Sequence, residues 1–319
     1  MKNKKEIRII AQKRSGQHAI IFWIISQVKG PVCYINNLFS VEKYKKKEIL
    51  KKISHGYKYG SEKWYFYNMN ADQVKKENLF SIKNKELFIS NVEEQKIKNI
   101  IKRIENLSIY TKGNSEEIFN VLILRDPYNL LASKLKRRRR IRYNSILNWI
   151  NYAKEYLDIT SYLGKNKIII NYNKWVVNKE YRKKILLQLG LDSENIDFTN
   201  IPTFGGGSSF SGTKYDGKAD RMDVFKRWES FKNNKQYLSM VKYKSLQMLS
   251  EVIFGETPND LKFENISGSI SISYIRFINI LFQTFLTLLN LFFIDKISKK
   301  YKNISKFYKS ILNLLKKRI

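Results

Sequence analysis

Cysteine, histidine and proline are scarce in this chain of 319 residues. The one cysteine, Cys33, leaves no partner for an internal disulfide, so the chain suits a reducing compartment. The only histidines are His18 and His55, and no Cys/His cluster has the spacing of a zinc site. We therefore expect neither a disulfide scaffold nor a zinc-binding domain.

Acidic residues are also few, because 28 Asp and Glu stand against 60 Lys and Arg, which gives a formal net charge of +32. Such a charge attracts nucleic acid, anionic lipid, acidic glycans and nucleotide phosphates. Lysine is abundant everywhere, however, so much of the charge also fits an ordinary solvated surface. No base-recognition module accompanies the basic segments, and we do not expect a nucleic-acid partner.

The N-terminus lacks the long apolar stretch and small-residue cleavage site of a signal peptide. Residues 1–5 are polar and lead directly into a strand pattern. Together with the single cysteine, this predicts a cytoplasmic protein.

Hydrophobic residues make up 43% of the chain, enough for a packed core. Short apolar runs alternate with segments of helical spacing. The expected strands are 6–12, 31–36, 87–92, 120–124 and 167–172, and the expected helices are 19–27, 95–107, 130–136, 146–163, 179–189, 222–231 and 237–253. This alternation predicts an α/β fold, a P-loop three-layer sandwich with a central, mainly parallel sheet.

We expect this domain to span residues 1–264 and a helical tail to span 265–319. Residues 277–294 carry no charge and show one narrow polar stripe, and residues 299–319 match a basic amphipathic helix. The tail therefore predicts peripheral attachment to an anionic membrane surface, with dimerisation or packing on the domain as alternatives.

The first predicted strand runs straight into a Lys-Arg-Ser-Gly-Gln-His turn at residues 13–18 and then into a helix. Such a loop points backbone N–H groups at one spot, with the helix dipole behind them, and Gly16 lets an anion approach closely. The G-x-x-x-x-G-K-[ST] pattern is absent, which disfavours an ordinary ATP or GTP hydrolase. A basic turn without a ligand is the alternative.

A second element begins where strand 120–124 ends. Arg125 stands at the carboxyl end of this strand, where ligands gather in open α/β sheets, and Ser133 follows eight residues later. An arginine and a hydroxyl so placed can clamp one phosphate.

Together the two elements resemble the sulfotransferase superfamily, which uses 3′-phosphoadenosine-5′-phosphosulfate (PAPS). There the first loop holds the 5′-phosphosulfate, and the later Arg and Ser bind the 3′-phosphate. The resemblance implies these roles for Arg125 and Ser133 at the 3′-phosphate. It assigns the phosphosulfate to Lys13, Arg14, Ser15, Gly16, Gln17 and His18, with Ala19 where cytosolic members stack a Trp on adenine.

Two further segments agree with the resemblance. Tyr172, at the end of strand 167–172, matches a Tyr that touches adenine in the family. The glycine-rich loop matches a late loop that closes over the 3′-phosphate, through Ser208, Ser209, Phe210 and Gly212. The chain departs from the family at Gln17, where Thr or Ser is usual. Arg14 in place of Lys resembles the carbohydrate-type members.

Sulfuryl transfer needs in-line positioning and neutralised charge on the bridging oxygen, which Arg14 and Lys13 supply in this scheme without a metal. The acceptor needs a general base. We expect Glu93, which follows strand 87–92, with His18 as second candidate. A helix N-terminal acid is the alternative role for Glu93.

The basic run at residues 134–142 favours an anionic acceptor, with a solvated helix end or a membrane contact as alternatives. The expected function is transfer of a sulfuryl group from PAPS to a hydroxyl or amine of a glycan or lipid-linked glycan. The alternatives are a P-loop nucleotide kinase-like enzyme and a non-catalytic basic protein that binds membranes or nucleic acid.

Overall fold

The computed structural model of the chain describes residues 3–39, 64–67, 86–106, 115–138, 141–191, 196–199, 201, 207–255 and 257–262. His55 and the predicted tail at 265–319 lie outside these residues. None of the described helices combines the length and apolar character that a bilayer span requires.

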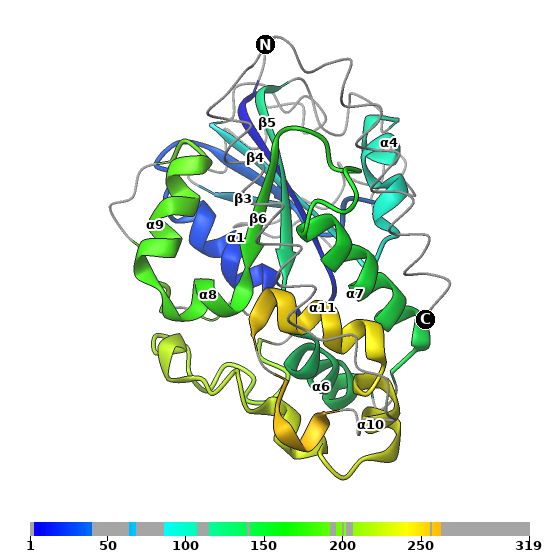
Figure 1. Cartoon of the computed structure of the whole chain (residues 1–319). Coiled ribbons are helices and arrows are strands. Elements are labelled where there is room, and N and C mark those ends of the chain that lie inside the picture. Colours follow the sequence, from blue (N-terminus) through cyan, green and yellow to red (C-terminus); the bar gives the residue numbers. More distant parts are fainter. Residues whose placement is uncertain are drawn as a thin grey trace, which may run out of the picture. The chain divides into compact units, whose positions relative to one another are not determined.

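The described strands form one six-stranded sheet in the order β3-β2-β4-β1-β5-β6 (Figure 1). Their bounds are β1 Asn3–Ala11, β2 Val32–Ile35, β3 Trp64–Tyr67, β4 Leu87–Glu93, β5 Ser115–Leu124 and β6 Lys167–Asn171. Every neighbouring pair is parallel except β2 and β3, so the antiparallel strand lies at one edge. The predicted, mainly parallel sheet is confirmed.

Successive side chains of the central strands enter different hydrophobic clusters. In β1, Ile7 and Ile9 belong to one cluster and Ile10 to the other, and in β5 Leu122 and Ile123 divide in the same way. Side chains of a strand alternate between the two faces of a sheet. Because all five are buried, both faces are covered, as parallel sheets require.

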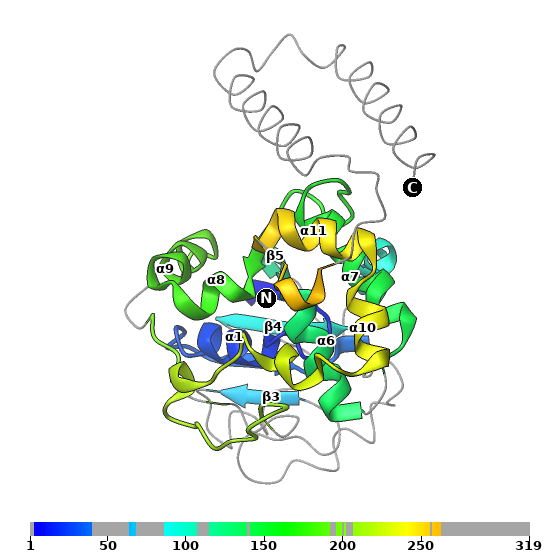
Figure 2. The same ribbon diagram turned by 60° about the horizontal axis from the view of Figure 1, so that its bottom comes forward.

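Helices supply the outer layers (Figures 1 and 2). One cluster is completed by α1 (Gln17–Ile25), α8 (Tyr172–Val177) and α9 (Lys179–Gln188). The other is completed by α4 (Ile100–Glu105), α6 (Pro127–Arg138), α7 (Tyr143–Tyr156), α10 (Lys235–Val241) and α11 (Lys244–Phe254). Short 3₁₀ helices are η3 Ile97–Asn99, η5 Ala219–Arg221, η6 Arg227–Phe231 and η7 Asn259–Leu261. The three-layer α/β prediction is confirmed.

Two helices have bounds that differ from the prediction. The segment predicted as helix 95–107 begins as the 3₁₀ turn η3 and becomes α-helical only at Ile100. The helix predicted to reach residue 163 ends at Tyr156. The buried Glu155 carboxylate accepts the backbone N–H groups of Tyr162 and Leu163, which turns the following residues into a loop.

Two further helix predictions near the C-terminal end of the domain were wrong. Of residues 222–231, only Arg227–Phe231 is helical, because the Asp223 carboxylate accepts the N–H groups of Phe225 and Lys226 in a turn. The helix predicted at 237–253 is two helices, α10 and α11. The Gln247 amide donates to the carbonyl oxygen of Val241, where α10 ends.

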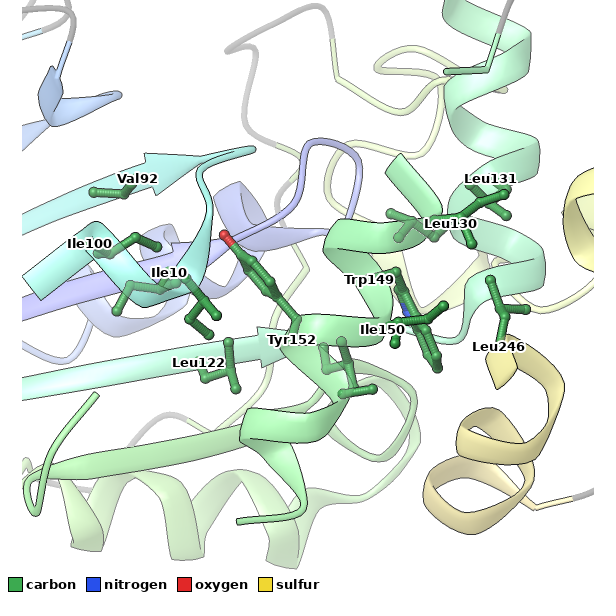
Figure 3. Close-up of a cluster of buried hydrophobic side chains, with 14 of the residues drawn as sticks. Ile10, Val92, Ile100, Leu122, Leu130, Leu131, Trp149, Ile150, Tyr152 and Leu246 are labelled. Atoms are coloured by element: carbon green, nitrogen blue, oxygen red, sulfur yellow. The ribbon is translucent and has the colours of Figure 1, made fainter. Parts of the chain in front are cut away.

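Trp149 connects the core to the edge of the sheet where β5 ends. Its side chain is fully buried among Leu130, Leu131 and Leu246 (Figure 3). The indole Nε1 donates to the carbonyl oxygen of Arg125 at 2.9 Å. The large hydrophobic cluster thereby fixes the backbone of the first residue after β5.

We expect Trp149→Ala to lower the free energy of unfolding by about 3–5 kcal/mol, because it empties a large buried site. Urea denaturation measures this change. Leu187→Ala, at a side chain that is 64% exposed, serves as the control and should change the value by no more than about 0.5 kcal/mol. Equal urea midpoints for the two variants would contradict this account of the core.

Candidate functional site

The carboxyl ends of β1, β4, β5 and β6 meet at one edge of the sheet, and a cleft of about 1260 Å³ opens there. Basic side chains outnumber acidic ones in its lining. The basic residues are Lys13, Arg14, Lys96, Lys98, Arg125, Lys134, Arg137, Arg142 and Arg227, and the acidic ones are Glu93 and Glu94. The cleft is therefore an electrostatic site for an anion.

The loop between β1 and α1 has left-handed backbone at two positions. Arg14 has φ 72° and Gly16 has φ 84°. Non-glycine residues in this region are strained, and such strain clusters at ligand sites. A Cβ on Gly16 would lie 2.0 Å from Cε2 of Tyr172, so the tyrosine ring packs directly on the loop.

Glu94 holds the start of this loop in place. Its carboxylate accepts the backbone N–H of Lys13 at 3.0 Å and the ammonium group of the buried Lys134. Glu94 itself has φ 57°. Because α4 begins only at Ile100, neither Glu93 nor Glu94 is a helix N-terminal acid.

Two buried arginines lie side by side deeper in the cleft. Arg125 is 1% exposed and donates to the carbonyl oxygens of Arg14 at 3.1 Å and Val224 at 2.8 Å. Arg227 is 8% exposed and donates to the hydroxyls of Ser133 and Ser208, each at 3.1 Å. Burial and the nearby charge of Arg125 lower the pKa of Arg227 to about 10.

Within the described part of the chain, neither arginine forms an ion pair with an acid, and the Nε atoms of both lack a hydrogen-bond partner. Buried charges without a counter-ion are costly. An anion with two charges, placed between the two guanidinium groups, would remove this cost. The two arginines are therefore suited to bind an anion next to the loop at residues 13–18.

Most of the residues predicted for the site meet in this one cleft. Its lining includes Lys13, Arg14, Gly16, Gln17, His18, Ala19, Glu93, Arg125, Tyr172, Ser208 and Ser209. Ser133 is fully buried behind Arg227. Ser15, Phe210 and Gly212 do not line it.

These three residues support the site from behind. Ser15 belongs to the loop at residues 13–18 itself and is 1% exposed. Gly212 exchanges two backbone hydrogen bonds with Ser208, and the Phe210 ring centroid lies 5.2 Å from the guanidinium carbon of Arg227. The late loop thus fixes Ser208 and packs on Arg227.

Sequence reasoning missed Arg227. It lies in a segment that was predicted as a helix, and no motif marks it. Its role comes from contacts with Ser133, 94 residues earlier, and with Ser208. Only the folded chain brings these groups together.

The two candidate bases are neighbours. His18 Nε2 lies 3.7 Å from the Glu93 carboxylate and 3.4 Å from the Asn36 side-chain oxygen. The Glu93 carboxylate also accepts the Gln17 amide and lies 3.6 Å from the Lys13 ammonium nitrogen. Burial lowers the pKa of His18, against the opposing effect of Glu93. The lowered pKa favours the neutral form of the His18 imidazole.

No protein-family model and no curated protein matches the sequence. Among solved structures, the sulfotransferase domain of the Synechococcus PCC 7002 olefin synthase matches with a TM-score of 0.42 and 14% identity, over 81% of this chain and 98% of that one. Mouse sulfotransferase SULT7A1, complexed with PAP, matches with a TM-score of 0.38 and 13% identity, over 77% of this chain and 84% of that one.

Gly16→Ala and Gly164→Ala form a matched pair. Both glycines have positive φ, but nothing lies within 4 Å of a Cβ at Gly164. We expect Gly164→Ala to lower the free energy of unfolding by about 1 kcal/mol, because alanine is strained at positive φ. Gly16→Ala should lower it by about 3 kcal/mol, because it also drives a methyl group into Tyr172. Thermal unfolding measures both, and equal losses would show that the loop does not pack on Tyr172.

We expect the pKa of His18 to lie below the ordinary histidine value of 6.5. The stability contributed by neutral His18 is then complete above about pH 6.5 and is lost as the pH falls through the lowered pKa. Titration of the imidazole signals by NMR in a His55→Gln variant isolates His18. A pKa of 6.5 or higher would contradict the effect of burial on His18.

Proposed function

We propose that the chain is a sulfotransferase that moves a sulfuryl group from PAPS to a hydroxyl or amine of an acceptor. The observation that carries this proposal is the buried pair of Arg125 and Arg227 with the hydroxyls of Ser133 and Ser208. The cleft thus offers two separate anion sites. A nucleotide with phosphates at both the 3′ and 5′ positions needs two such sites, whereas the contiguous phosphates of ATP need only one.

The residues present fit such a nucleotide. The Nε atoms of Arg125 and Arg227 are buried and unpartnered among the described residues. Tyr172 packs on Gly16, and its ring centroid lies 5.0 Å from the guanidinium carbon of Arg125. The tyrosine therefore lies between the two anion sites, where the nucleoside would be bound.

When bound, PAPS would supply an activated sulfuryl group and leave as adenosine 3′,5′-bisphosphate. Arg14 and Lys13 neutralise negative charge that develops at the 5′-phosphate, together with the N–H groups of the loop. Neutral His18 takes the proton of the acceptor hydroxyl on an unprotonated ring nitrogen, and Glu93 stabilises the resulting imidazolium. Glu94 keeps the loop in position through the N–H of Lys13.

We propose a glycan or lipid-linked glycan as the acceptor. The exposed basic side chains of Arg137 and Arg142 on the cleft support an acidic acceptor. The sequence pattern of residues 265–319 supports a peripheral location on an anionic membrane surface, which stays a prediction because the tail lies outside the described residues.

We expect Arg227→Gln to weaken binding of adenosine 3′,5′-bisphosphate by about 30-fold or more, because the 3′-phosphate would lose a charged donor. Binding of adenosine 5′-monophosphate should change by less than about threefold. Calorimetric titration measures both ligands. Arg125→Ala should lose the same preference for the bisphosphate over the monophosphate. It should also destabilise the loop at residues 13–18, because it removes the hydrogen bond to the Arg14 carbonyl oxygen.

Arg221→Gln is the matched control, since Arg221 is exposed and is not part of the cleft lining. It should leave both affinities unchanged. Binding of ATP as tight as that of the bisphosphate, with no loss in Arg227→Gln, would overturn the proposed function and favour a kinase-like enzyme.

A further inference from the structure

One wall of the cleft is a face of α7. Asn144, Asn148 and Asn151 line the cleft, and their spacing of four and three residues places them on one side of the helix. Trp149 and Ile150 on the other side are buried in the core. The helix thus presents a row of amide side chains to the cleft.

This row begins at the proposed transfer site. The side-chain amide of Gln12, which directly precedes the loop at 13–18, donates to the carbonyl oxygen of Ser145 at 3.0 Å. The opposite wall carries the exposed Lys96 and Lys98. The Tyr152 hydroxyl donates to the Gln95 carbonyl oxygen at 3.1 Å and holds the two walls together.

An aromatic ring lines the cleft beyond the end of α7. Tyr162 is 41% exposed and belongs to the lining. The fully buried Glu155 carboxylate fixes its loop by accepting the Tyr162 N–H at 3.0 Å and the Thr160 hydroxyl. Tyr162 is therefore held as an exposed ring on a fixed support.

The charge of this half of the cleft is positive. Lys96, Lys98, Arg137 and Arg142 line it, and the carboxylate of Glu94 is already paired with Lys134. A small neutral acceptor would use neither these cations nor the amides. Amide side chains both donate and accept hydrogen bonds, which suits hydroxyl groups.

We infer that this half of the cleft is the subsite for an anionic oligosaccharide, which extends from the transfer site along α7 toward Tyr162. Hydroxyls meet the asparagines, acidic groups meet the lysines and arginines, and Tyr162 packs on a sugar ring. Asn144 and Asn151 are separated by about 10 Å along the helix axis, so the subsite is longer than one monosaccharide. The inference rests on the proposed function, because it treats the oligosaccharide as the acceptor.

The test is binding of a fluorescently labelled hexagalacturonate, followed by anisotropy, to the full chain. Asn148→Asp should weaken binding about tenfold through charge repulsion, whereas Asn233→Asp, an exposed position outside the cleft lining, should change it by less than about twofold. Lys98→Ala should also weaken binding about tenfold. Lys184→Ala on α9 is its control and should not.

Unlabelled competitors separate charge from hydroxyl recognition. Hexaglutamate, which has charges without sugar hydroxyls, and maltohexaose, which has hydroxyls without charges, should each compete at least about tenfold more weakly than hexagalacturonate. Equal competition by hexaglutamate, or equal affinities of Asn148→Asp and Asn233→Asp, would overturn the subsite.

Titration of the same proteins with adenosine 3′,5′-bisphosphate keeps the two proposals distinguishable. If Asn148→Asp weakens binding of the oligosaccharide but leaves binding of the nucleotide unchanged, the result supports the subsite. Wild-type protein that binds the oligosaccharide but not the nucleotide would overturn the proposed function and, with it, the acceptor role of the oligosaccharide.

Discussion

The rest of the site depends on the interactions of the buried guanidinium group of Arg125. It donates to the loop at Arg14 and to the chain at Val224, and it lies against the ring of Tyr172. The backbone of the same residue accepts the indole N–H of Trp149. One residue at the end of β5 therefore joins the core, the loop at residues 13–18, Tyr172 and the segment that carries Arg227. Its charge has no acidic counter-ion among the described residues, and this is why we propose that an anion binds there.

Two adjacent residues of α6 contact both proposed anion sites, the one at Arg227 and the loop at residues 13–18. Ser133 accepts a hydrogen bond from Arg227, while Lys134 pairs with Glu94, which in turn holds the loop at Lys13. A shift of α6 would therefore move Arg227 and the loop at residues 13–18 together. This explains why buried polar side chains occupy positions where an ordinary core helix would place apolar ones. Such buried polar side chains lower the stability locally, which fits the proposed role of these residues in ligand binding.

The features that could be predicted are those that local sequence patterns determine. Five of the six strands were predicted because their buried runs are short and bounded by turns, whereas β3 was not predicted. The loop at 13–18, Arg125 and Ser133 were found because each follows a strand at a fixed offset. Arg227 and the role of Glu94 could not be predicted, since both depend on contacts between segments far apart in the chain. The helix expected at 222–231 failed for a local reason, because Asp223 offers its carboxylate to the backbone of a turn. The roles of Glu93 and His18 in proton transfer stay predictions, although the structure places the two side chains together.

The most direct measurement is a crystal structure of the protein with adenosine 3′,5′-bisphosphate. The account predicts the 3′-phosphate between Arg125 and Arg227, within hydrogen-bond reach of Ser133, and the 5′-phosphate on the loop at residues 13–18. A nucleotide bound in the cleft with no phosphate at the two buried arginines would contradict it.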